Sequence, residues 1–346
     1  MAEYNTKKSV ASLGDVDPEV VQYLAREGSK HPMLSIPLPK LVEMSRQNAL
    51  PLQAELTNVL SIAIPMRDGY QNRALVFEPT DSSPPKPLVV LIHGGGFCLG
   101  DSSLMKTHAR AIRTLYNAVV VCISYRLAPE FKFPAAPHDV WDNLRWLSAK
   151  GNAESLGADL STGFIVGGTS AGASMTAVVA QKWVTQAVSP SMTGLWLNMP
   201  HVIESNYVPE KYKELWFSRD QNADSFLLNK TARAFISSTY EADVNSPEYS
   251  PFNGESPHHG LPPVYFQVNG NDPLRDDGLI YEKVLRDCGV ETRIDVYPGF
   301  PHGYADVFPQ LDSSRKRRID ALKGFGWLLG KEALEEECAE ADKNAM

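Results

Sequence analysis

The sequence predicts an α/β protein in which a mostly parallel, twisted sheet of eight strands is flanked by helices and partly covered by a helical cap. Continuous apolar runs such as LVVLI at 88–92 and AVVVCIS at 118–124 are typical of strands buried on both faces. Segments with helical spacing lie between these runs, and such alternation builds parallel sheets with right-handed crossovers. One long stretch, 200–260, lacks strand signals and is expected to be an inserted lid.

Composition narrows the class of protein. The chain has 346 residues, of which 43% are hydrophobic and 21% charged, as in ordinary globular proteins. A net charge of −8 argues against nucleic-acid binding, which needs a basic face. The polar start of the chain has no secretory leader, and no apolar run could span a membrane, so we expect a cytoplasmic protein.

The N-terminal part carries helical signals before the first strand. Residues 1–16 are expected to be loosely ordered. Asp17 and Pro18 give a helix start, and this helix should end near Gly28. A second amphipathic segment follows Pro39. The two helices could cover the core, or they could form half of a lid over a pocket.

The remaining elements are expected in a regular order. Arg67-Asp68-Gly69 is a hairpin signal between the first two strands. The acidic end of the chain, 331–346, is expected to be a frayed tail. Strands are predicted at 56–64, 70–77, 88–92, 118–124, 164–166, 194–197, 264–268 and 292–297, and helices at 103–116, 137–149, 173 onward, 278–287 and 312–329, with helical pieces of the lid near 212–217 and 231–238.

The stretch 164–178 carries the strongest chemical signal. A short apolar strand runs into Gly168-Thr169-Ser170-Ala171-Gly172, and a helix follows. A serine at the apex of such a sharp turn has an exposed hydroxyl, and the helix N-terminus points amide N–H groups at nearby negative charge. The alternative is an ordinary Gly/Ser turn before a buried helix.

A serine nucleophile needs a base, and the base needs an orienting carboxylate. Asp272 follows the strand at 264–268, and His302 follows the strand at 292–297. Ligands of parallel sheets bind beyond the carboxyl ends of the strands, so Ser170, Asp272 and His302 should meet at one site. Their chain order is that expected of a serine at such a turn.

Each partner has an alternative interpretation. Asp272 could merely cap the next helix, and His302 could be a surface-loop histidine. Other candidates for the acid and the base stand nearby in sequence, although none directly ends a predicted strand; they are Asp276, Asp277, Glu282, His258 and His259.

The loop His93-Gly94-Gly95-Gly96 follows the strand at 88–92. Glycines let bare backbone N–H groups approach a substrate, and a tetrahedral intermediate needs such donors for its oxyanion. The N–H of Ala171 would be a third donor. A merely flexible glycine loop is the alternative.

Together these motifs resemble a known family. HGGGF at 93–97, YRLAPE at 125–130, FPAAPHD at 133–139, GTSAG at 168–172, DPLRD at 272–276 and PHGY at 301–304 resemble the hormone-sensitive-lipase-like carboxylesterases of the α/β-hydrolase superfamily. The resemblance covers about residues 56–330. Two departures are that Thr169 stands where many members have an acidic residue, and Ala173 where many have glycine.

The resemblance implies roles for individual residues. It makes Ser170 the nucleophile, Asp272 the acid and His302 the base. It assigns the oxyanion donors to Gly95, Gly96 and Ala171, and His93 to holding the loop.

The resemblance also implies a domain organisation. It divides the chain into an N-terminal cap segment at 1–55, a core at 56–199 and 261–330, a cap insertion at 200–260 and the tail at 331–346. Four aromatic residues of the insertion could supply apolar surface for the substrate: Tyr207, Trp216, Phe217 and Phe226. For each of them taken singly, ordinary packing within the lid is the favoured alternative.

Three functions follow as hypotheses. The first is a serine carboxylesterase that hydrolyses small to medium hydrophobic esters through an acyl-enzyme, without metal or organic cofactor. The second keeps the fold but transfers acyl groups or eliminates in natural-product biosynthesis. The third is a ligand receptor like the plant gibberellin receptors, which lack the catalytic histidine, whereas His302 is present here. A homodimer is possible.

Overall fold

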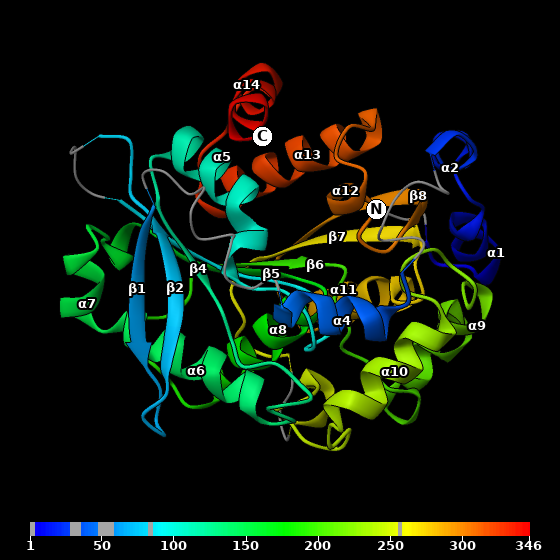
Figure 1. The fold of residues 1–346 in the computed structure, drawn as a ribbon, viewed down its shortest axis with the longest axis horizontal. Coiled ribbons are helices and arrows are strands. Elements are labelled where there is room, and N and C mark those ends of the chain that lie inside the picture. The colour runs from blue at the N-terminus through cyan, green and yellow to red at the C-terminus, as the bar shows by residue number, and fades with distance from the viewer. Residues whose placement is uncertain (1–3, 28–35, 48–58, 82–85, 255–257) are drawn as a thin grey trace.

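A twisted sheet of eight strands runs through the molecule, as predicted (Figure 1). The computed structural model describes residues 4–27, 36–47, 59–81, 86–254 and 258–346. The spatial order of the strands is β1-β2-β4-β3-β5-β6-β7-β8. The strands are β1 Leu60–Pro65, β2 Gln71–Phe77, β3 Leu88–Ile92, β4 Val119–Ile123, β5 Phe164–Thr169, β6 Gly194–Asn198, β7 Val264–Asn271 and β8 Thr292–Pro301.

The sheet is mostly parallel, with antiparallel pairing at the edge where the predicted hairpin lies. The Asp68-Gly69 turn joins β1 and β2 as an antiparallel hairpin, and β2 pairs antiparallel with β4. All other pairings are parallel. The central strands β3, β4 and β6 are buried along their whole length, as their uninterrupted apolar runs require.

Helices cover both faces of the sheet (Figure 1). One face packs against α6, α8 and α11, and the other against α5, α13 and α14. The helices are α1 Lys7–Ala11, α2 Pro18–Glu27, α4 Leu38–Gln47, α5 Lys106–Tyr116, α6 Ala135–Ser148, α7 Lys150–Ser155, α8 Ala171–Thr185, α9 Ser218–Gln221, α10 Lys230–Tyr240, α11 Arg275–Asp287, α12 Tyr304–Val307, α13 Asp312–Leu328 and α14 Glu335–Ala345. None of the helices in these described ranges is long and apolar enough to cross a membrane.

Most predicted boundaries are within a few residues of the observed ones. The first strand begins at Leu60, and the predicted positions 56–58 lie outside the described residues. The helix predicted at 103–116 divides into a 3₁₀ turn, Ser102–Met105, and α5. The last strand, β8, extends to Pro301, so His302 follows it directly.

The prediction that residues 1–16 are loosely ordered is wrong for residues 4–16, and residues 1–3 lie outside the described residues. The side chain of Thr6 caps α1, and a 3₁₀ turn, Ser12–Gly14, follows that helix. Val10 and Leu13 are buried against Val268 and Leu279. The segment is held by two apolar side chains spaced one turn apart, which is too short a pattern to stand out in the sequence.

The prediction of a frayed C-terminal tail is also wrong. Residues 335–345 form α14, which packs against α5 and α13 (Figure 1). Cys338, Ala341 and Ala345 share one buried helix face, and Asp342 forms a salt bridge with Arg318 at 2.7 Å. The acidic residues that suggested fraying lie mainly in the first turn, where carboxylates stabilise a helix.

Parts of the stretch between β6 and β7, together with α4, line the cavity at Ser170 and His302, which follow the carboxyl ends of β5 and β8. This stretch contains a 3₁₀ turn, Glu210–Leu215, followed by α9 and α10. Helices α4 and α10 contact one another in front of the sheet (Figure 1).

Candidate active site

Ser170 sits at the junction between β5 and α8. Its backbone has φ 54° and ψ −118°, a conformation that costs energy in a non-glycine residue and that clusters at functional sites. Its N–H donates a hydrogen bond to the carbonyl of Asn198 at 2.7 Å, which holds the turn against β6. A Cβ at Gly172 would collide with the carbonyl oxygen of Ile92, so the close passage of helix and strand requires glycine there.

The structure brings the three predicted residues together. His302 Nε2 lies 2.9 Å from Ser170 Oγ, and His302 Nδ1 lies 2.7 Å from Asp272 Oδ2. The other oxygen of Asp272 accepts the N–H of Leu274 at 2.8 Å. Asp272 can therefore orient the imidazole, and the imidazole can accept the serine proton.

The burial of these three residues is graded. Asp272 is 1% exposed and His302 is 9% exposed, whereas Ser170 is partly exposed and lines a cavity. A buried carboxylate interacts strongly with the imidazolium, because water screens the two charges little. Of the three residues, Ser170 and His302 line the cavity, whereas Asp272 does not.

Asparagine side chains hold the two loops that carry Asp272 and His302. Asn222 donates to the carbonyls of Gly270 and Asp272 at 3.2 and 2.9 Å. Asn269 donates to the carbonyl of Pro301 at 2.7 Å, just before His302. Sequence reasoning missed both asparagines. Asn269 lies in the strand that leads to Asp272, which could have singled it out, whereas Asn222 gave no signal in the lid.

The other candidates for the catalytic acid form hydrogen bonds or salt bridges with groups other than His302. Asp276 accepts the N–H groups of Phe217 and Ser218, both at 2.6 Å, and Asp277 forms a salt bridge with Arg219 at 3.0 Å. Burial raises the pKa of Asp277 despite the opposing charge of Arg219. Glu282 accepts the hydroxyl of Thr292 at 2.7 Å.

The competing histidines differ in burial. His258 packs between the rings of Phe252 and Tyr281, and burial lowers its pKa to about 4. His259 is exposed. The hydrogen bonds to Ser170 and Asp272 come from His302.

The glycine loop after β3 lies beside the nucleophile. A Cβ built on Gly94 would lie 3.3 Å from the Cβ of Ser170. The N–H of Ala171 belongs to the first residue of α8 and therefore has no partner within that helix. Gly95 and Gly96 thus line the same cavity as Ser170, and Ala171 directly follows Ser170 at the start of α8.

His93 is enclosed at the base of this loop. Its ring stacks on Tyr125 at 4.2 Å, and Nδ1 lies 2.7 Å from the carbonyl of Gly94, so this nitrogen carries the proton. Burial lowers the pKa of His93 to about 4, which keeps the ring neutral. The side chain therefore fixes the loop and is not exposed to a substrate.

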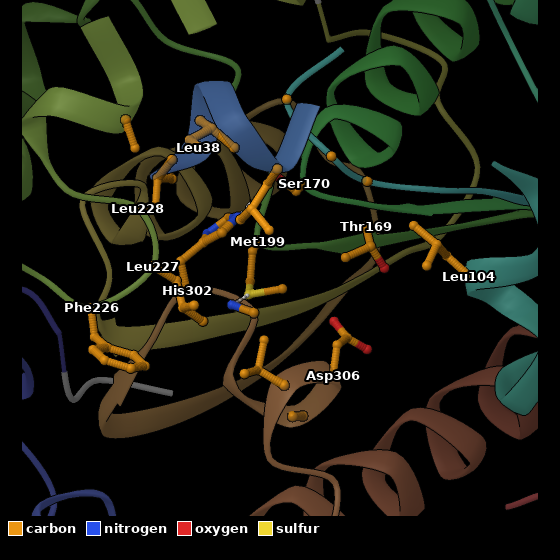
Figure 2. Close-up of a pocket in the computed structure, with 18 of the residues that line it drawn as sticks. Leu38, Leu104, Thr169, Ser170, Met199, Phe226, Leu227, Leu228, His302 and Asp306 are labelled. Carbon is orange, nitrogen blue, oxygen red and sulfur yellow. Dashed lines mark hydrogen bonds between the residues drawn. The ribbon is translucent and has the colours of Figure 1, made fainter. Parts of the chain in front are cut away.

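Ser170 and His302 open into a cavity of about 960 Å³ (Figure 2). Phe226, Leu227, Leu228 and Leu38 lie on one side of the pair, and Leu104 and Asp306 lie on the other. Helices α4 and α10 contribute residues to the walls.

Of the four aromatic residues that could have supplied apolar surface for the substrate, one lines the cavity and three do not. Phe226 lines it, whereas Trp216 and Phe217 pack towards the core and Tyr207 donates to Asn245 at 2.8 Å. Phe235 of α10 lines the cavity and was not predicted.

The sheet order, the serine at the turn after β5 and the histidine after β8 define the class of α/β-hydrolases. The model of a family described as alpha/beta hydrolase fold matches residues 89–306. An α/β-hydrolase superfamily protein of Schizosaccharomyces pombe is 33% identical over 329 residues, covering 91% of this chain and 94% of that protein. The esterase LipI of Mycobacterium tuberculosis is 33% identical, covering 82% and 86%.

A solved structure has the same fold. Vibralactone cyclase superposes with a TM-score of 0.80 at 27% identity, covering 92% of this chain and 96% of that one. The chain therefore belongs to the hormone-sensitive-lipase-like carboxylesterase family of the α/β-hydrolase superfamily, and with it to the carboxylic ester hydrolases.

Proposed function

We propose that this protein is a serine carboxylesterase that cleaves small to medium hydrophobic esters through an acyl-enzyme. The observation that carries the proposal is the continuous hydrogen-bond chain from Asp272 through His302 to Ser170, which ends in a cavity with apolar walls. In this proposal the three residues are the acid, the base and the nucleophile.

The reaction follows from the arrangement of these groups. Ser170 Oγ attacks the ester carbonyl carbon while His302 Nε2 takes its proton, and Asp272 stabilises the imidazolium. The N–H groups of Gly95, Gly96 and Ala171 donate to the oxyanion of the tetrahedral intermediate. His302 then gives its proton to the leaving alkoxide, and the alcohol departs.

Deacylation repeats these steps with water. His302 takes a proton from the water that attacks the acyl carbon, and it returns this proton to Ser170 Oγ as the acid leaves. The proposal needs no group beyond the chain itself and water.

The substrate class follows from the cavity and its cap. From the N-terminal segment 1–55 we assign α4 to the cap, and with it the insertion 200–260, because α4 and α10 line the cavity. Apolar walls over a buried triad favour hydrophobic acyl or alcohol groups. A volume of about 960 Å³ suits esters of small to medium size.

Turnover of short p-nitrophenyl esters by the wild type and Ser170→Ala tests the proposal. We expect the wild type to be active and the variant to lose activity by several orders of magnitude. Ser174→Ala is the matched control, since Ser174 lies one turn further along α8 and its hydroxyl donates to the Ser170 carbonyl at 3.1 Å. Full turnover by Ser170→Ala would refute the assignment of the nucleophile.

A second candidate function is acyl transfer or elimination. The enclosing cap and the similarity to a protein named a cyclase favour it. Product analysis of an ester reaction with and without an added acceptor alcohol separates the two functions. Free acid as the main product in both cases supports hydrolysis, and transfer product supports the alternative.

A further inference from the structure

A short segment of the N-terminal region crosses the carboxyl ends of β7 and β8, where the two loops that carry Asp272 and His302 begin. We call residues 13–17 the strap. The side chain of Asn271 donates to the carbonyl of Gly14 at 2.7 Å, and the N–H of Asp17 donates to the carbonyl of Gly299 at 3.1 Å. One end of the strap is thus bonded to Asn271, the last residue of β7, and the other to Gly299 of β8, three residues before His302.

The strap is in tight contact with both loops. A Cβ at Gly270 would collide with the carbonyl oxygen of Leu13, and it would lie 2.8 Å from the N–H nitrogen of Gly299. The strap and the two loops therefore meet at one point, and Gly270 is needed for this close approach.

Apolar packing anchors the strap on both sides. Leu13 is buried with Val268 of β7 and Leu279 of α11. After the strap, Val20 and Tyr23 of α2 pack against Phe300 and its neighbours around the His302 loop. The segment therefore cannot shift relative to one loop without disturbing its contact with the other.

We propose that the strap is a positioning element for the proposed triad, with Gly14, Asp17 and Asn271 as positioning residues. The pairing of β7 with β8 up to Asn271 and Pro301 sets the spacing of the two strand ends. The strap braces these ends, and so it maintains the 2.7 Å hydrogen bond between Asp272 and His302. None of residues 4–27 lines the cavity, so the strap acts on the geometry of catalysis and not on substrate binding. The inference rests on the proposed esterase function.

The test compares Asn271→Ala and Asn271→Asp, both of which remove the donor to Gly14, with a chain that begins at Pro18. We expect kcat to fall about tenfold or more with KM nearly unchanged, because a misplacement of about 1 Å costs about a hundredfold in rate. We also expect the low-field proton resonance of the hydrogen bond between His302 and Asp272 to weaken or shift.

The control is Asn5→Ala. Asn5 lies in the same N-terminal region but outside the strap. Its side-chain oxygen accepts a hydrogen bond from Lys283 Nζ at 2.6 Å, away from both loops. It should keep the wild-type kcat and the resonance. If the shortened chain does not fold, the two Asn271 variants decide the question.

Folded Asn271 variants with wild-type kcat and an unchanged resonance would overturn the proposal. If the wild type neither cleaves esters nor reacts with a fluorophosphonate, the proposed function fails. The resonance would still decide whether the strap holds the two loops together.

Discussion

At the scale of single residues, chemistry depends on side chains placed at strand ends. Ser170, Asp272 and His302 were predicted because each follows an apolar strand, and parallel strands end at one edge of a sheet. The supporting asparagines were not predictable in the same way. An amide that bonds a distant carbonyl, as Asn222 does with Gly270, follows no periodic pattern and depends on tertiary neighbours.

Asp272→Asn tests the carboxylate. The amide can keep a hydrogen bond, but it cannot stabilise the imidazolium, so kcat should fall by several orders of magnitude. Asp306→Asn is the control, because Asp306 also lines the cavity but lies on an exposed turn of α12. Steady-state kinetics on one ester measures both variants. A mild loss for Asp272→Asn would instead favour Asp276 or Asp277.

At the scale of elements, helix α10 packs against the glycine loop that follows β3. Tyr240 stacks on Phe97 with ring centroids 4.1 Å apart and an angle of 2° between the planes. A Cβ built on Gly96 would lie 2.6 Å from Cδ1 of Ile236, so Ile236 covers this loop. The sequence predicted helical pieces in the insertion, but it could not predict which side of α10 faces the cavity, because the helix has apolar residues on both sides.

Ile236→Ala should widen the cavity beside the glycine loop. Removing the side chain leaves space in the cavity, so kcat/KM should rise for longer esters relative to shorter ones. The ratio of kcat/KM for p-nitrophenyl octanoate over acetate should rise several-fold. Ser237→Ala, on the exposed side of α10, should leave the ratio unchanged. An unchanged ratio for Ile236→Ala would remove this residue from the substrate pocket.

The C-terminal helix offers a second test at this scale. Its charged sequence suggested a frayed tail, since its buried positions are the small residues Cys338, Ala341 and Ala345 and give only a weak apolar stripe. Ala341→Glu should destabilise the protein by about 3 kcal/mol, because it buries an unpaired charge. Asn344→Glu, on the exposed side, should have little effect. Equal urea midpoints for both variants would indicate a tail that does not pack.

At the scale of the whole molecule, the core holds histidines in their neutral form. Burial lowers the pKa of both His93 and His258 to about 4, from an ordinary value of 6.5. The unfolded chain therefore binds more protons than the folded one between these values. Stability should be fully present above pH 6.5 and should fall as the pH drops towards 4.

His258→Gln should reduce the loss of folding stability at low pH. Each histidine contributes up to about 3 kcal/mol to the pH dependence, because one pKa unit corresponds to about 1.4 kcal/mol. Free energies of unfolding in urea at pH 7 and pH 5 measure the effect. His259→Gln, at the exposed neighbour, should keep the wild-type difference. A wild-type stability that does not change between the two pH values would contradict this account.

At this scale, the sequence predicted the sheet and its flanking helices, but it did not predict that residues near both ends of the chain are ordered. The long apolar strands fix the sheet because each is buried on both faces, whereas the N-terminal strap and α14 depend on a few small contacts.

The most direct test of the central claim is reaction of the protein with a fluorophosphonate, followed by intact mass and peptide mapping. An activated serine beside oxyanion donors should be labelled once, at Ser170, and Ser170→Ala should not be labelled. Absence of labelling, or labelling at another residue, would contradict the proposed active site.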